Sequence, residues 1–265
     1  FPEDPIVGEE DAGILRDNPD ICRQVSDLVN EHTDAVTESR MLEVLDFGSR
    51  DTDFTKRFWT ADPIDGTKGF LRGDQYAVAL ALVENGQIVI GILGCPNFQA
   101  DDRQPDEGKG YLLYAVRGEG AFMMPLKGGD RKRISVDALT SAEKARFCES
   151  VESAHTSHGT HKRISDTLGI TSPPYRIDSQ AKYAAVACGS ASIYLRLPGN
   201  KEYREKIWDH AAGAVIVSEA GGQVTDFGGK ALDFSISRKL EGNTGILATN
   251  GHLHQQVLRA ISEVV

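Results

Sequence analysis

Two β-hairpins in the middle of the chain constrain its fold more than any other feature of the sequence. Residues 76–83 and 87–93 are predominantly apolar, and the pair Asn85-Gly86 stands between them. Both residues of that pair tolerate a positive φ, which a two-residue hairpin turn requires. Residues 111–124 predict a second hairpin with a glycine-containing turn. We therefore expect an antiparallel sheet in the first half of the chain.

The second half of the chain has a different texture. After a polar, glycine-containing stretch near residues 126–134, short β-rich segments alternate with segments of helical periodicity. The expected helices cover residues 157–168, 180–188, 209–220 and 252–265. Alternation of this kind is typical of α/β organisation with a mixed sheet. We expect two subdomains, an α+β one over residues 1–130 and an α/β one over residues 131–265.

Composition and charge exclude several classes of function. The chain has 265 residues and a formal net charge of −10, which argues against binding a nucleic-acid polymer through its phosphates. Its longest apolar runs are short and interrupted, so no membrane span is expected. The four cysteines are scattered without metal-binding spacing, which favours reduced thiols in a reducing compartment. We expect a cytoplasmic monomer, and a targeting segment upstream of Phe1 stays open.

The segment with most chemical information covers residues 62–67, which read DPIDGT. Asp62 follows a short predicted strand, and the proline after it should stop that strand from pairing further. Asp65 comes three residues later, so two carboxylates and the Ile64 carbonyl could project from one turn. Oxygen ligands of this kind suit hard cations such as Mg²⁺.

Two neighbours of these carboxylates add to the pattern. Gly66 lets the backbone approach a ligand closely, and the Thr67 hydroxyl could orient a water molecule. Asp-Pro and Asp-Gly are also common turn formers, and for an isolated string that structural interpretation is the better one. Bound cations would invert the negative local charge of such a segment. The segment therefore needs support from elsewhere in the chain.

Two further acidic clusters provide that support. Glu9 and Glu10 belong to a run of three acids, which is either a solvated charge run or part of a cation site. Asp209 follows Trp208 at the start of an apolar helical segment, where it is either a helix N-cap or a carboxylate held beside packed surface. Together the three clusters would make a site for two or three Mg²⁺ ions. Two such ions about 4 Å apart activate water and stabilise the leaving oxygen.

Several motifs occur together in a recognisable order. They are GEE, DPIDGTKGFLRGDQYAVALAL, GCPN, RGEGAF, DSQAKY, YLRLP and EKIWDHAAG. In this combination the chain, from Val7 onward, resembles the lithium-sensitive, magnesium-dependent phosphatase superfamily that includes inositol monophosphatase. It is most similar to the fungal and plant bisphosphate nucleotidase branch. The resemblance implies a layered αβαβα sandwich with an antiparallel sheet in the first half and a mixed sheet in the second.

The resemblance also implies roles for individual residues. It implies metal ligands at Glu10, Asp62, the Ile64 carbonyl, Asp65 and Asp209. Glu9 is the alternative to Glu10 as a ligand and could act on a bound water. Thr67 and Asp65 would be catalytic, and Thr67 would help to activate the attacking water. The resemblance implies substrate binding by Gly66, Thr67, His155, Ser179, Lys182, Arg196 and Asp209.

Taken without the resemblance, the substrate-binding residues are less informative. His155 is a lone histidine of a kind that is often on the surface, Ser179 could be a helix N-cap, and Lys182 could be solvated. Arg196 is the most suggestive of them. An arginine inside an apolar strand needs an anionic partner, and phosphate is a natural one.

The implied activity is Mg²⁺-dependent hydrolysis of the 3′-phosphate of adenosine 3′,5′-bisphosphate, with phosphoadenylyl sulfate as a second substrate and a link to sulfate assimilation and lithium sensitivity. An inositol or sugar phosphate phosphatase and a catalytically silent nucleotide or metal sensor are the alternatives. Members of the superfamily carry a helical segment before the GEE turn, including an Asp that pairs with the motif threonine. Only six residues precede Val7, so we expect this chain to be part of a longer one.

Overall fold

A seven-stranded sheet dominates the first half of the structure, a computed structural model that describes residues 1, 3–100, 108–151, 158–198, 200 and 202–265. Its neighbouring strands follow sequence order: β1 (Ile6–Gly8), β2 (Phe58–Asp65), β3 (Ala77–Glu84), β4 (Gln87–Cys95), β5 (Tyr111–Val116), β6 (Gly120–Pro125) and β7 (Lys132–Ile134). The pair β1–β2 is parallel and the other pairs are antiparallel. The expected antiparallel sheet is confirmed.

The first hairpin has the turn that its sequence predicts. Asn85 and Gly86 join β3 to β4 with φ values of 53° and 73°. Both values lie in the left-handed region that asparagine and glycine adopt most readily. This local signal was sufficient to place the central strands of the sheet.

Strand β2 departs from the prediction at Pro63. The expectation that the strand ends before this proline is wrong, because β2 continues to Asp65, which pairs with Ala77 of β3. The register shifts between Asp62 and Asp65. A bulge of this kind accommodates a residue that has no N–H to donate to the ladder. Both carboxylates thereby come to the end of one strand.

A five-stranded sheet belongs to the second half of the chain. Its strands run in the order β11 (Gln223–Thr225), β12 (Ile246–Thr249), β10 (Ile193–Arg196), β8 (Phe147–Glu149) and β9 (Tyr175–Arg176). The pairs of β12 with β11 and with β10 are antiparallel, while β8 pairs parallel with β10 and with β9. The sheet is therefore mixed, as expected.

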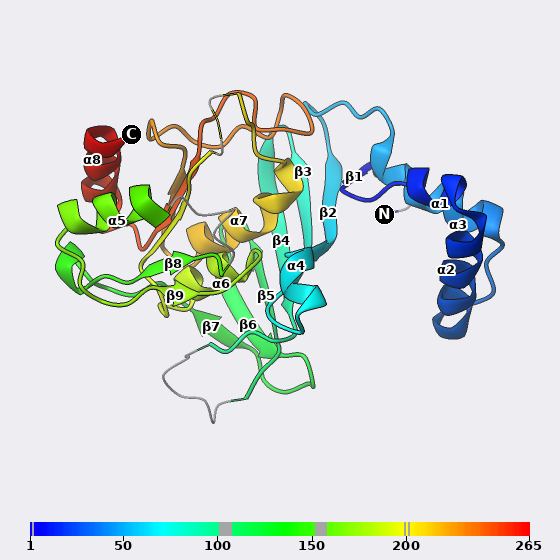
Figure 1. The fold of residues 1–265 in the computed structure, drawn as a ribbon, viewed down its shortest axis with the longest axis horizontal. Coiled ribbons are helices and arrows are strands. Elements are labelled where there is room, and N and C mark those ends of the chain that lie inside the picture. Colours follow the sequence, from blue (N-terminus) through cyan, green and yellow to red (C-terminus); the bar gives the residue numbers. More distant parts are fainter. Residues whose placement is uncertain (2, 101–107, 152–157, 199, 201) are drawn as a thin grey trace.

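Helices lie between and beside the two sheets (Figure 1). The α-helices are α1 (Gly13–Asp17), α2 (Pro19–His32), α3 (Glu38–Leu45), α4 (Thr67–Leu71), α5 (His158–Thr167), α6 (Ala181–Ala187), α7 (Ala211–Glu219) and α8 (His254–Val264). Helices α6 and α7 are sandwiched between the sheets, α5 and α8 cover the far side of the second sheet, and α1–α3 form a group beside β1. This layering confirms the predicted fold class.

Helix α7 is at the centre of the core. Residues 211–217, all small or aliphatic, are buried. Two glycines permit its close packing: a Cβ at Gly91 would lie 2.4 Å from Val215 Cγ1, and one at Gly213 would lie 2.2 Å from the Tyr183 ring. Because a side chain at either position would force the neighbours apart, α7 is held firmly on both faces. The residues just before its first turn are held with it.

The start of α7 corrects a second expectation. A helix was expected from Asp209, but a 3₁₀ turn, η5 (Ile207–Asp209), comes first and α7 begins at Ala211. No side-chain hydrogen bond caps the helix start. Asp209 therefore does not serve as an N-cap, and its carboxylate instead lines the pocket described below.

The main hydrophobic core spans both halves of the chain. Helix α7 packs against β3, β4 and β5 of the first sheet, and β7 completes that sheet from beyond residue 130. The division into two subdomains at residue 130 stays a prediction. Within the described ranges, no helix is both long enough and apolar enough to cross a membrane.

Candidate active site

A pocket of about 300 Å³ lies at the end of β2, where the two halves of the chain meet. Segment 62–69 forms one wall, segment 178–182 forms another, and Glu9 and Ser150 contribute at the edges. The pocket brings together most of the residues that the sequence predicts: Asp62, Ile64, Asp65, Gly66, Thr67, Ser179, Lys182, Arg196 and Asp209. His155 lies outside the described residues.

Three carboxylates converge in this pocket. One oxygen each from Glu9, Asp62 and Asp209 lies within 4.8 Å of the others. Asp62 is only 1% exposed. Burial, with repulsion from Asp65 and Glu9, raises the pKa of Asp62 to about 9. Like charges this close are unfavourable unless protons or cations neutralise them.

Asp209 and Asp65 also have raised pKa values in this pocket. Burial raises the pKa of Asp209 to about 7, and repulsion from Asp65 adds to the effect. Burial also raises the pKa of Asp65, although attraction by Lys182 and a hydrogen bond from the Gln180 N–H oppose it. Within the described part of the chain, no lysine or arginine forms a salt bridge with Asp62 or Asp65.

This donor set fits a divalent cation. Its groups are carboxylates with an adjacent main-chain carbonyl, and these hard oxygen ligands suit Mg²⁺ or Ca²⁺ rather than softer metals. A cation would also remove the mutual repulsion of the buried acids. The described residues that would hold it are Glu9, Asp62, Asp65, Asp209 and the carbonyl of Ile64.

The structure separates the two glutamates of the GEE turn. Both are exposed, but Glu9 lines the pocket and belongs to the acidic cluster, whereas Glu10 lines no part of it. The reason is the parallel pairing of β1 with β2, in which Gly8 lies opposite Ala61 and the Glu9 N–H donates to the Ala61 carbonyl at 3.3 Å. Glu9, the alternative to Glu10, therefore has the better position for a metal ligand.

The positive side of the pocket contains a buried lysine. Lys182, on α6, is 4% exposed, and its Nζ lies 3.1 Å from Ser150 Oγ and 5.4 Å from the centroid of the Tyr194 ring. Burial lowers its pKa, while attraction by Asp65 opposes the change. An ammonium group with so few polar partners favours an anion in the pocket.

Arg196 belongs to a second charged network behind the acids. Its Nε donates to Glu205 Oε2 at 2.8 Å, and its Nη2 lies 3.9 Å from Asp209. His210 Nε2 lies 3.2 Å from the same Glu205 oxygen, and the Tyr183 hydroxyl lies 2.7 Å from His210 Nδ1. Burial lowers the pKa of His210, so a neutral ring donates to Glu205 and accepts from Tyr183.

This network makes one apparent metal cluster implausible as a cation site. Glu205, Asp209 and His210 also place ligand atoms within 4.8 Å of one another. However, both ring nitrogens of His210 have partners, and Glu205 already pairs with a guanidinium. The network therefore holds Arg196 in place. Sequence reasoning did not single out Glu205, whose only signal was its place in the EKIWDHAAG motif.

Gly66 and Ser179 lie in close contact in the wall of the pocket. A Cβ at Gly66, whose φ is 84°, would lie 2.8 Å from the Cβ of Ser179. Ser179 itself has a φ of 66°, a strained value for a residue with a side chain, and its Oγ accepts from the Ala181 N–H at 3.2 Å. Gln180, not Ser179, occupies the N-cap position of α6, so the helix-capping interpretation of Ser179 is wrong, and Ser179 lines the pocket instead.

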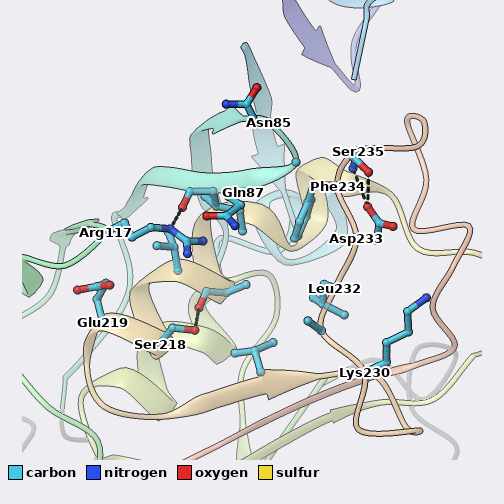
Figure 2. Close-up of a pocket in the computed structure, with 16 residues that line it drawn as sticks. Asn85, Gln87, Arg117, Ser218, Glu219, Lys230, Leu232, Asp233, Phe234 and Ser235 are labelled. Carbon is cyan, nitrogen blue, oxygen red and sulfur yellow. Dashed lines mark hydrogen bonds between the residues drawn. The ribbon is translucent and has the colours of Figure 1, made fainter. Parts of the chain in front are cut away.

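A second, larger cavity lies at the other end of α7. Figure 2 shows its walls, which come from the β3–β4 turn, α7 and the loop around residues 230–235, and its volume is about 590 Å³. Its acids have hydrogen-bond donors: Glu219 accepts from the Gly118 and Gly120 N–H groups, and Asp233 accepts from Ser235. In the described residues no cluster of acids suited to a metal occurs there.

Comparison with known proteins agrees with this geometry. The model of the inositol monophosphatase family matches residues 1–265, so the chain belongs to that family. It is 44% identical to a 3′(2′),5′-bisphosphate nucleotidase of Schizosaccharomyces pombe, with 100% of this chain and 78% of that protein covered. It is 43% identical to one of Oryza sativa, with 98% and 76% covered. The predicted resemblance is confirmed, as is the phosphatase class.

Solved structures confirm the fold. An IMPase of Thermotoga maritima has a TM-score of 0.59 and 29% identity, covering 81% of this chain and 71% of that one. An inositol monophosphatase of Anabaena has a TM-score of 0.58 and 23% identity, covering 81% and 75%. The layered arrangement of Figure 1 is therefore that of the inositol monophosphatases.

Proposed function

We propose that the chain is a Mg²⁺-dependent 3′(2′),5′-bisphosphate nucleotidase that converts adenosine 3′,5′-bisphosphate to AMP and phosphate. The observation that carries this proposal is a pocket in which crowded carboxylates, of which Asp62 is buried, lie together with Lys182 and Arg196. Such a pocket suits cations and a phosphorylated ligand together. Similarity over the full chain to proteins named 3′(2′),5′-bisphosphate nucleotidase supports the choice of substrate.

The carboxylates would hold two or three Mg²⁺ ions. Asp62, Asp65 and Asp209 are the central ligands, with Glu9 in preference to Glu10, and the Ile64 carbonyl is next to them. When bound, the ions would supply Lewis acidity and charge neutralisation for the departing oxygen. Because the ligands come from β2, η5 and the turn after β1, binding would also join these three segments.

The side chains of the pocket would bind and orient the substrate. Lys182 would contact a phosphate with its buried ammonium, and Arg196, held by Glu205, would present its outer nitrogens to a second anionic group. The hydroxyl of Thr67, which donates to the Ile64 carbonyl at 3.3 Å, would hold the attacking water in line with the 3′-phosphate. Ser179 and Gly66 would limit the width of the entrance.

Two finer properties belong to the same proposal. Phosphoadenylyl sulfate would be a second substrate, because it carries the same 3′-phosphate next to a 5′-linked anion. Li⁺ would inhibit by occupying one of the Mg²⁺ positions between the carboxylates. We further propose a monomer, consistent with a pocket built from one chain.

A substrate panel tests the proposal. Phosphate release would be measured with adenosine 3′,5′-bisphosphate, phosphoadenylyl sulfate, inositol 1-phosphate and fructose 1,6-bisphosphate, with Mg²⁺ and with EDTA. We expect the two nucleotides to have the highest kcat/KM and EDTA to abolish turnover. Preference for inositol or sugar phosphates would move the assignment within the family. Tight, Mg²⁺-dependent nucleotide binding without phosphate release from any substrate would point to a sensor instead.

A further inference from the structure

Arg238 binds two main-chain carbonyls and packs on an aromatic ring. Its Nη1 donates to the Gly48 carbonyl at 2.7 Å and its Nη2 to the Gly8 carbonyl at 2.6 Å. Its guanidinium carbon lies 4.9 Å from the centroid of the Trp208 ring. Each of these contacts crosses a long stretch of sequence, and none of them is with a carboxylate.

Two of the contacted residues adjoin the proposed metal ligands. Gly8 immediately precedes Glu9, and Trp208 immediately precedes Asp209. Gly48 packs directly on Gly8, because a Cβ at Gly48 would lie 3.1 Å from the Gly8 nitrogen. Arg238 therefore lies between the turn that carries Glu9 and the segment that carries Asp209.

The backbone around Arg238 is itself attached to the second of these segments. The Ile207 N–H donates to the Arg238 carbonyl at 3.2 Å, and the Leu240 N–H donates to the Glu205 carbonyl at 2.9 Å. Trp208 is 5% exposed, so the indole that the guanidinium covers is a fixed surface. The side chain of Arg238 thus extends from a rigid base toward the GEE turn.

We infer that Arg238 is a positioning residue for the cation site, which fixes Glu9 relative to Asp209 without touching substrate or metal. Glu9 is exposed and follows a strand of only three residues, so its position depends on contacts from outside its own segment. The inference rests on the proposed function, because it assumes that the acidic cluster binds divalent cations. Residues that orient metal ligands from behind typically change metal affinity about 10- to 100-fold when replaced.

The direction in which cation affinity changes on replacing Arg238 distinguishes a positioning role from an electrostatic one. Arg238 carries a positive charge that interacts with Asp11. It also lies beside the residues adjoining Glu9 and Asp209, so a purely electrostatic role predicts that its removal tightens cation binding. A positioning role predicts weaker binding instead. Arg238→Met removes the charge and both hydrogen bonds. Arg238→Lys keeps the charge but lacks the planar guanidinium, whose two outer nitrogens reach the two carbonyls.

The experiment measures binding of Mn²⁺ and Mg²⁺ to the metal-free protein by isothermal titration calorimetry, without substrate. We expect about 10-fold weaker binding in Arg238→Met and in Arg238→Lys. The control is Arg117→Met, because Arg117 also donates to a main-chain carbonyl, that of Ile88 at 2.8 Å, but lies at the other cavity. It should bind cations like the wild type.

The possible outcomes distinguish failure of the proposed function from failure of the positioning role of Arg238. If the wild type binds no divalent cation, the proposed function fails. If the wild type binds cations and both Arg238 variants bind them equally well or more tightly, the inference is overturned and the proposed function stands. Circular dichroism checks folding, and Arg238→Lys remains informative if Arg238→Met does not fold. In turnover assays the apparent metal constant should rise more than kcat falls at saturating metal.

Discussion

The two ends of α7 offer an internal comparison, because each has an acid beside a cavity. Glu219, at the C-terminal end, accepts from the Gly118 N–H at 2.9 Å and from the Gly120 N–H at 2.8 Å. Asp209, before the N-terminal end, is crowded instead by Asp62 and by Glu9. One carboxylate thus has donors for both oxygens, and the other is surrounded mainly by its own kind.

Cavity size alone would favour the end beside Glu219 over the end where we propose the active site. The cavity beside Glu219 has a volume of about 590 Å³ and the acidic pocket about 300 Å³. The smaller pocket is the one where the protein compensates the acidic charges only in part, and such groups favour binding of a ligand. The comparison teaches that unsatisfied charge, rather than volume, distinguishes the end of this helix at which we propose the active site.

The largest expected effect comes from exchanging a carboxylate for an amide at each end. Asp209→Asn should lower kcat/KM roughly 100- to 1,000-fold, because a charge that stabilises the transition state through bound cations is lost. Glu219→Gln should leave kcat/KM unchanged. Phosphate release from adenosine 3′,5′-bisphosphate measures both. Equal losses in the two variants would show that the two ends of α7 do not differ in the way we argue.

Metal dependence of stability provides the control for that experiment. Mg²⁺ should raise the unfolding midpoint of the wild type and of Glu219→Gln, because a ligand that binds only the folded state stabilises it. The rise should be absent or much reduced in Asp209→Asn. In EDTA, Asp209→Asn should be at least as stable as the wild type, since the substitution relieves repulsion. Differential scanning fluorimetry measures these shifts.

Lys182 sharpens the comparison from the positive side. Lys182→Met keeps the buried aliphatic volume and removes the ammonium, so kcat/KM should fall about 10- to 100-fold, mainly through KM. Arg117→Met removes a positive charge at the other cavity and should change neither constant. An unaltered KM for the nucleotide in Lys182→Met would contradict a phosphate contact by this residue.

The pH dependence of the metal-free protein should reveal the uncompensated acids. The folded-state pKa values of Asp62, about 9, and of Asp209, about 7, lie above the usual 3.8. The stabilisation of their protonated forms is complete below pH 4 and is lost as pH rises toward 9. Chemical denaturation in EDTA should therefore show stability falling over this range, and saturating Mg²⁺ should flatten the fall. A flat profile in EDTA would contradict the crowding.

His254 should shape the acidic side of the same profile. Burial lowers its pKa from 6.5 to about 4, while its ring bonds to Thr225 and Thr249 at 2.9 Å each. A depressed histidine pKa stabilises the fold above pH 6.5, and this contribution, about 2 to 3 kcal/mol, is lost as pH falls through 4. Mg²⁺ should not restore it. His254→Asn should weaken the acid-side slope if the protein folds.

Local sequence patterns predicted the parts of the molecule that local physics decides. Asn85-Gly86 fixed the central hairpin because its backbone preference acts over two residues. Asp62, Asp65 and Asp209 were predicted from the acidic clusters and again through the family resemblance, and the structure brings them to one pocket. Their roles as ligands stay predictions, although their positions agree with those roles.

Positions set by distant packing were not predictable in the same way. Choosing between Glu9 and Glu10 depends on how β1 pairs with β2, a contact across more than fifty residues that no local pattern encodes. Arg238 stands in a polar loop segment whose composition gives no sign of its contacts. Pro63 predicted the end of β2, yet the strand continues past it, because a bulge accommodates the proline and β3 resumes the pairing at Asp65.

The smallest expected effect completes the comparison of the two helix ends. Glu219→Gln keeps one acceptor oxygen but turns an amide group toward one of the two glycine N–H groups, so that donor loses its charged partner. We expect the free energy of unfolding to fall by about 1 to 2 kcal/mol. Urea denaturation measures this loss with and without Mg²⁺. The increase in the free energy of unfolding that Mg²⁺ causes should be the same in the variant as in the wild type. If Mg²⁺ stabilised the variant less than the wild type, Glu219 would be coupled to the cation site through α7, and the two ends would not be independent.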